Sequence, residues 1–177
     1  MQGGSSPTDD LNAIGVLKRR EIEARVIAPL VEELSKEFGR EKILKVLRKV
    51  IVRIAAAQGE RLAARMGGCS PAHLADSLRD WKKGDALEIE VLELSDEKLS
   101  FDVNRCRYAE LYQALGIPEL GEILSCGRDF ALSEGFNPKL KLTRTQTILG
   151  GSSHCDFRYT LDSEECQDDL LTASEQE

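Results

Sequence analysis

The sequence lacks the short motifs that mark the best-known catalytic and nucleotide-binding sites. It contains no P-loop and no GxGxxG, HExxH, GxSxG or CxxC pattern. It has no apolar run of about 18 residues, so we expect no membrane partner or transmembrane span. Acidic residues outnumber basic ones by 31 to 24, for a net charge of −7. Because phosphate binding needs a basic face, this balance argues against nucleic acid as the main partner.

The polar N-terminal stretch MQGGSSPTDD does not resemble a secretory signal peptide. We therefore expect a cytoplasmic location, where thiols stay reduced. The five cysteines are then core residues, metal ligands or catalytic thiols rather than structural disulfides. Cys69 and Cys166 fall in a predicted loop and a predicted tail, and we assign them no role.

The length suits one domain. We predict that residues 1–8 are disordered and that residues 162–177, which are acidic and polar, form a disordered tail. Between them, residues 9–161 form one α+β domain, helical over 9–82 and containing a sheet over 85–161. The expected architecture is an antiparallel sheet of two β-hairpins, separated by a helical pair and covered on one face by N-terminal helices.

Apolar periodicity predicts three N-terminal helices, over residues 11–38, 40–66 and 71–81. Pro29 lies inside the first pattern, so we expect a kink or a break there. Gly39 is suited to end that helix, and Ser70 to cap the third one. Because the first two helices are rich in apolar and alanine positions, they are also candidates for packing against a second copy of the chain.

The second half of the sequence alternates like paired strands. We predict strands at 86–94, 99–104, 139–148 and 155–161. Two helical stretches, 108–115 and 119–133, separate the hairpins, and the segment from Gly135 to Pro138 ends the second stretch.

Cys106 stands where a predicted strand leads into a helix. A thiolate at a helix N-terminus is stabilised by free N–H groups, and Arg105 and Arg107 add positive charge. This setting is typical of a reactive cysteine. The alternative is a buried cysteine that acts as a small hydrophobic residue.

Two further clusters contain thiols. Cys126 and Asp129 are three residues apart and share one face of a predicted helix, so a thiol and a carboxylate could meet there. On a strand, His154 and Asp156 point to one side and Cys155 to the other. His154 is a second candidate for proton transfer, since the pKa of histidine lies near working pH.

Two mechanisms fit if these thiols converge. In one, a cysteine attacks an electrophilic carbon while a carboxylate moves protons, and no cofactor is needed. In the other, the cysteines hold zinc or iron together with His154 or Asp129, and the metal activates water. The cysteine spacing matches no known metal motif, so we prefer the first mechanism.

Several motifs occur in the same order as in the L-2-amino-thiazoline-4-carboxylic acid hydrolase family, which the sequence resembles over most of residues 14–160. They are LKRREIEA from Leu17, CRYAE from Cys106, LGIPEL from Leu115, Cys126-x-x-Asp129, GFNP from Gly135, LxRTxT from Leu142, Gly150, and CDFRY from Cys155. The resemblance implies hydrolytic opening of a small heterocycle at a C–N bond. The activity that names the family adds water to a C=N carbon of an aminothiazoline carboxylate and gives N-carbamoyl-L-cysteine.

Taken with the resemblance, the residues suggest roles. Cys106 is the expected nucleophile, Asp129 the general acid/base, and Cys126 an assisting thiol. Arg144 is suited to pair with a substrate carboxylate, since a guanidinium binds carboxylates in a bidentate manner; a surface or cross-strand ion pair is its alternative. The expected substrate-binding residues are completed by Cys155, His154 and Tyr108. The rival function is a non-catalytic sensor module that binds a small molecule or a metal in the same cysteine-lined pocket.

Overall fold

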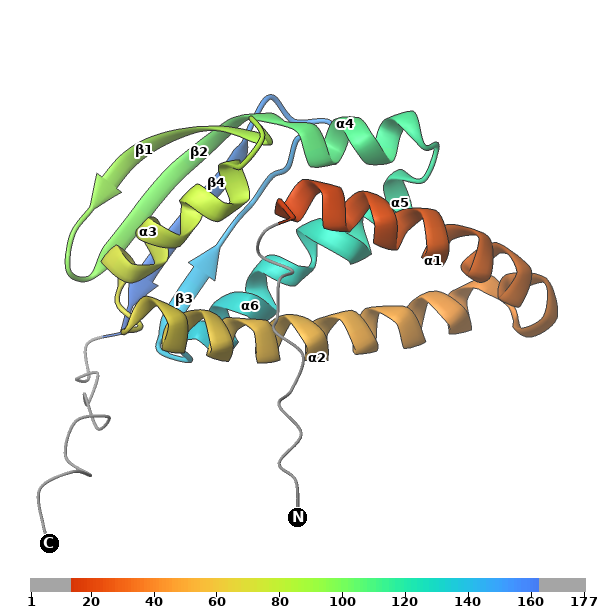
Figure 1. The fold of residues 1–177 in the computed structure, drawn as a ribbon, viewed down its shortest axis with the longest axis horizontal. Coiled ribbons are helices and arrows are strands. Elements are labelled where there is room, and N and C mark those ends of the chain that lie inside the picture. Colours follow the sequence, from red (N-terminus) through yellow and green to blue (C-terminus); the bar gives the residue numbers. More distant parts are fainter. Residues whose placement is uncertain (1–13, 163–177) are drawn as a thin grey trace, which may run out of the picture.

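The computed structural model describes residues 14–162 as an antiparallel sheet with helices packed against one face (Figure 1). Its strand order is β1-β2-β4-β3, so β4 lies between β2 and β3. The strands are β1 (Leu87–Leu94), β2 (Lys98–Cys106), β3 (Leu140–Thr143) and β4 (Cys155–Leu161). The helices are α1 (Val16–Phe38), α2 (Arg40–Met66), α3 (Pro71–Lys82), α4 (Arg107–Ala114), α5 (Pro118–Gly121), the π-helical turn η2 (Glu122–Cys126) and α6 (Arg128–Phe136).

The predicted α+β class is confirmed. The predictions for residues 1–13 and for 163–177 lie outside the described part of the chain. Between residues 14 and 162, no helix is both long and apolar enough to span a membrane.

The two long helices form an antiparallel hairpin (Figure 1). Gly39 alone joins them, with a φ of 85° that favours glycine. The predicted bounds of α2 are confirmed. A kink or a break was expected at Pro29, and α1 continues through this proline without a break. Pro29 is exposed, so solvent can hydrate the carbonyl that loses its helical partner, and packing on the other side of α1 holds the helix together.

Helices α2 and α6 cross at very close range. A Cβ built on Gly59 would lie 2.1 Å from the Leu132 carbonyl oxygen, and one on Gly135 would lie 2.0 Å from that of Ala56. The prediction that the segment from Gly135 to Pro138 ends this helix is confirmed, since α6 runs to Phe136. Gly135 lies in the last turn of α6 and permits this close backbone approach.

The third strand is much shorter than predicted, because β3 ends at Thr143 instead of Ile148. The backbone N–H groups of Thr145 and Gln146 donate to the Asp156 carboxylate at 2.9 and 2.8 Å. A side chain thus takes the donors that a longer strand would offer to its neighbour, and residues 144–154 form a loop.

Two apolar cores meet near the end of β2. One lies between the sheet and helices α2, α3 and α6, and contains Phe101, Phe157 and Tyr159 from the sheet. The other lies among α1, α2, α4, α5 and η2. Cys106 and Leu87 pack against both. The thiol of Cys106, where β2 leads into α4, therefore lies at the junction of the two cores.

Candidate functional site

A cavity of about 120 Å³ lies at this junction. Its lining includes all three predicted thiols, Cys106, Cys126 and Cys155, together with Asp129 and other residues. The thiols come from the end of β2, from η2 and from the start of β4, so only the tertiary fold brings them to one space. The remaining lining residues are Val16, Arg20, Trp81, Leu87, Phe101, Val103, Tyr108, Ser125, Arg128, Leu132, Arg144 and Phe157.

Cys106 is the residue that immediately precedes α4. Burial raises the pKa of its thiol to about 11, while the backbone N–H groups of Ala109 and Tyr108 act in the opposite direction. The helix N-terminus therefore does not produce a resting thiolate here, because burial has the larger effect. A reaction at Cys106 needs a partner that accepts its proton.

Asp129 can accept a proton near neutral pH. Burial raises the pKa of its carboxyl to about 6, although the Arg144 guanidinium lowers it in part. The two side chains form an ion pair with a 2.5 Å separation between Arg144 Nη1 and Asp129 Oδ2. The Asp129 side chain keeps 24% of its surface exposed. A carboxyl that changes charge around pH 6 is suited to general acid/base chemistry.

Arg144 holds three parts of the site together. Besides Asp129, it donates to the Cys126 carbonyl at 3.0 Å, and its guanidinium lies 5.2 Å from the centroids of the Phe130 and Phe157 rings. A substrate carboxylate would have to share this guanidinium with Asp129. The geometry therefore favours a positioning role for Arg144, and the predicted contact with substrate stays a prediction.

Cys126 ends the π-helical turn η2, a rare irregularity that is frequent at functional sites. The sequence predicted a continuous helix here, and the turn instead separates α5 from α6. Burial raises the pKa of Cys126 far above the ordinary thiol value, and the nearby Asp129 adds to the effect. Cys126 is thus a neutral group in the cavity wall.

Cys155 and Tyr108 line the cavity with their polar atoms already bound. The Cys155 sulfur accepts a hydrogen bond from the Ile148 N–H at 3.2 Å, which ties the loop before β4 to the strand. The Tyr108 hydroxyl donates to the Trp81 carbonyl at 3.2 Å. Both residues shape the cavity and fix its surroundings.

Sequence reasoning missed two buried arginines. Arg20 of α1 and Arg128 of α6 line the cavity and are only 8% and 4% exposed. Burial and, to a smaller extent, the positive charge of Arg20 lower the pKa of Arg128 to about 10. Arg20 pairs with Glu23, and Arg128 donates to Gln58. The sequence contained a signal for the burial of Arg20 but not of Arg128. Arg20 lies four residues before Ala24, on the same face of the helix, and the structure buries that face.

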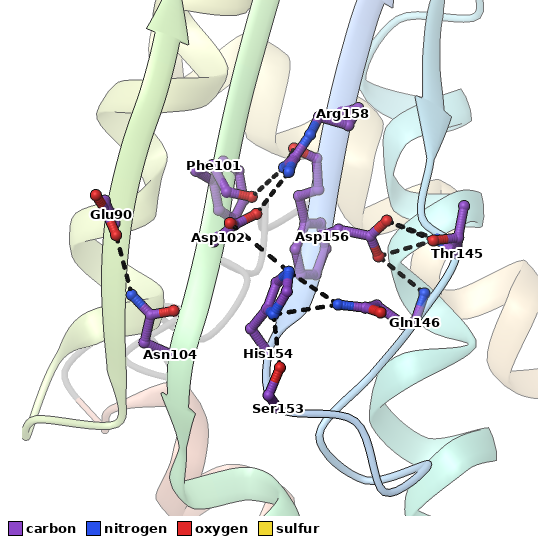
Figure 2. Close-up of polar contacts among 11 residues, drawn as sticks. Glu90, Phe101, Asp102, Asn104, Thr145, Gln146, Ser153, His154, Asp156 and Arg158 are labelled. Carbon is purple, nitrogen blue, oxygen red and sulfur yellow. Dashed lines mark hydrogen bonds and ion pairs between the residues drawn. The ribbon is translucent and has the colours of Figure 1, made fainter.

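His154 lies on the opposite face of the sheet (Figure 2). Its ring contacts Gln146 and Ser153, and its Nε2 is 3.7 Å from the Asp102 carboxylate, which also pairs with Arg158 at 2.7 Å. His154 is not among the residues that line the cavity. The structure therefore brings together every predicted site residue except His154.

Two further observations concern ligands. Within residues 14–162, no three or more His, Cys, Asp and Glu side chains form a group suited to a metal ion. A more polar cleft of about 380 Å³ adjoins the cavity and shares Arg144 with it. Its other lining residues include Glu122, Thr145, Gln146 and Ser152.

The fold and the cavity define an α+β protein with a small, largely apolar cavity that is lined by thiols, one carboxylate and three guanidinium groups. The chain belongs to the L-2-amino-thiazoline-4-carboxylic acid hydrolase family, because the family model matches residues 19–159. The predicted family membership is thereby confirmed. No curated protein matches the chain.

Solved structures that are similar to this chain include two at low sequence identity. The phenol-responsive sensory domain of the transcription activator PoxR, solved with phenol, is 13% identical with a TM-score of 0.49, over 77% of this chain and 73% of that one. A trafficking protein particle complex subunit 3 from Naegleria fowleri, covalently bound to palmitic acid, is 16% identical with a TM-score of 0.49, over 81% of this chain and 95% of that one.

Proposed function

We propose that this protein is a hydrolase that opens a small heterocycle at a C=N carbon, with Cys106 as nucleophile and Asp129 as general acid/base. The observation that carries the proposal is that both groups line one cavity in a member of this hydrolase family. Its volume of about 120 Å³ is of the same order as the roughly 150 Å³ void that accepts benzene, so it is on the scale of one small ring. Aminothiazoline carboxylates and related cyclic amidines are the proposed substrate class.

The lining of the cavity suits both the ring and the carboxylate of such a molecule. Aromatic and aliphatic side chains such as Phe101 and Phe157 offer contacts to a planar ring. Arg20 is already paired with Glu23, whereas Arg128 donates to the neutral amide of Gln58, and a buried positive charge is costly unless an anion compensates it. The ring carboxylate is the proposed anion, which moves the predicted carboxylate contact from Arg144 to Arg128.

The reaction consists of two additions and two eliminations. The Cys106 sulfur adds to the C=N carbon, and Asp129 passes the thiol proton to the ring nitrogen. The carbon then re-forms a C=N bond and expels the ring heteroatom, to which Asp129 transfers that proton. Water next adds to the same carbon, and expulsion of Cys106 as a thiol leaves a C=O group. One water is consumed, and both side chains return to their starting states.

The chemistry of the product identifies the bond that breaks. N-carbamoyl-L-cysteine keeps both nitrogens on the carbonyl carbon, so its formation from an aminothiazoline breaks the C–S bond. The expectation of C–N cleavage is therefore inconsistent with this product, because C–N cleavage would give S-carbamoyl-cysteine. For an aminothiazoline we propose C–S cleavage, and for rings without sulfur the corresponding C–N cleavage.

The test is turnover of an aminothiazoline carboxylate, with product mass and position of the carbamoyl group read by mass spectrometry and NMR. We expect N-carbamoyl-cysteine from the wild type and a loss of at least about a thousandfold in Cys106→Ser, the scale seen when a nucleophile is removed. Cys69→Ser, outside the cavity, is the matched control. Unimpaired turnover by Cys106→Ser would remove the nucleophile assignment, and tight binding without turnover by the wild type would favour the sensor module.

A further inference from the structure

Helix α1 exposes a continuous row of large apolar side chains. Ile22, Val26, Leu30, Leu34 and Phe38 recur every four residues, and each is between 42% and 57% exposed. Neighbours four residues apart touch along a helix surface, so the five form one stripe. Isolated exposed apolar residues are normal, but a contiguous patch of this kind marks an interaction surface.

The charges beside the stripe are arranged against the dipole of the helix. Apart from Arg20, which lies in the cavity, α1 has three basic and two acidic residues over residues 16–27, and one basic and three acidic residues over residues 28–38. Its first turn has no acidic residue. An isolated helix is stabilised by the opposite order, with acids near the N-terminus and bases near the C-terminus. The helix dipole therefore does not account for this order.

We propose that α1 packs antiparallel against α1 of a second copy of this chain, around a two-fold axis between Val26 and Leu30. In that arrangement the basic half of each helix lies toward the acidic half of the other. Because a row spaced by four residues is inclined to the helix axis, its central part, Val26 and Leu30, is what packs against itself. A two-fold interface uses the same patch on both subunits, so a charge gradient along one helix is self-complementary only in the antiparallel orientation.

The same charges argue against an anionic membrane surface as the occupant. Glu32, Glu33 and Glu37 lie on the half of α1 that carries Leu34 and Phe38. Anionic lipid headgroups would repel these carboxylates, whereas amphipathic membrane helices carry Lys and Arg on their polar face. A second copy meets both the apolar and the acidic part of the surface.

The first test is the solution mass of the full chain by light scattering at micromolar concentrations. We expect twice the chain mass of 19.6 kDa for the wild type. The double variant Val26→Glu/Leu30→Glu should be monomeric, with a dimer dissociation constant raised at least about a hundredfold, since two buried apolar contacts per subunit are lost. Leu92→Glu, at a similarly exposed apolar residue of β1, should remain dimeric.

Charge reversal tests the orientation. Lys18→Glu/Arg25→Glu makes both halves of the stripe acidic, and Glu32→Lys/Glu37→Lys makes both halves basic. Each variant alone should dimerise at least about tenfold more weakly, and their equimolar mixture should form a heterodimer. A monomeric wild type, a dimer that survives Val26→Glu/Leu30→Glu, or a mixture that does not associate would overturn the proposal. Binding of a monomeric wild type to anionic vesicles would assign the stripe to a membrane instead.

Discussion

Similar polar residues lie in different surroundings on the two sides of the sheet. On the covered side, Asp129 of α6 has one strong ion pair, with Arg144, and burial raises its pKa to about 6. On the open face, burial acts on the pKa of Asp156 in the same direction, but a hydroxyl and two backbone N–H groups from Thr145 and Gln146 outweigh it and lower the pKa.

The comparison shows that partners alone do not decide the state of a carboxyl. Asp129 contacts a full positive charge and still binds its proton more tightly than Asp156, which contacts neutral donors. The loss of water is the larger effect on the covered face. A proton-transfer role therefore suits the covered face, and a structural role suits the network on the open face (Figure 2).

The largest expected difference is in kcat, between a variant that lacks the carboxylate on the covered side of the sheet and one that lacks the carboxylate on the open side. Asp129→Asn should lower kcat about a thousandfold, which is within the range for loss of a general acid/base. In the wild type, kcat/KM should change with an apparent pKa near 6, and this step should vanish in Asp129→Asn. Asp156→Asn should leave kcat within about threefold of wild type, since Asp156 lies outside the cavity. Equal losses in both variants would contradict the comparison.

The next prediction concerns the free energy of unfolding, in variants of one arginine from each side of the sheet. Arg144→Met leaves the Asp129 charge buried without its cation, so the free energy of unfolding at pH 7 should fall by about 3 kcal/mol. Arg158→Met breaks the more exposed pair with Asp102 and should cost less than about 1 kcal/mol. Urea unfolding measures both. Equal costs would show that burial does not separate the two ion pairs.

Substitution of one arginine on each side of the sheet should change substrate binding to different extents. Arg128→Met should raise KM for a carboxylate-bearing ring about 30-fold, the value of a lost charged hydrogen bond, and should change kcat little. The ring analogue without the carboxylate should show no such change. Arg128→Lys keeps the positive charge and should recover part of the substrate binding that Arg128→Met loses. Arg158→Met should leave KM unchanged, and a rise in its KM would assign binding to the open face.

The last prediction concerns the pH dependence of stability, which should have opposite signs for the two aspartates. Asp129 has a folded pKa raised above its unfolded value, so its contribution is full below about pH 4 and is lost as the pH rises through about 6. Asp156 has a lowered folded pKa, so its contribution is present above the unfolded pKa and is lost as the pH falls. Unfolding from pH 3 to 7, with each Asn variant compared with wild type, should give slopes of opposite sign.

Local chemistry in the sequence was enough to predict much of the scaffold. The bounds of α2, the cap and proline that start α3, and the position of Cys106 before α4 all depend on neighbours within a few residues. The alternation of β4 likewise separated His154 and Asp156 from Cys155 before any fold was known. Period and capping are local properties, and the structure follows them.

Long-range contacts decided the rest. Pro29 remains inside α1 because the opposite side of that helix is packed, and Asp156 ends β3 by taking backbone donors eleven and ten residues away. No sequence pattern places Cys106, Cys126 and Cys155 at one cavity, or Arg20 beside Arg128. The sequence by itself determined the elements and the faces of their residues. Only the tertiary structure decided which faces meet, and burial at that meeting point then set the protonation of the thiols and of Asp129.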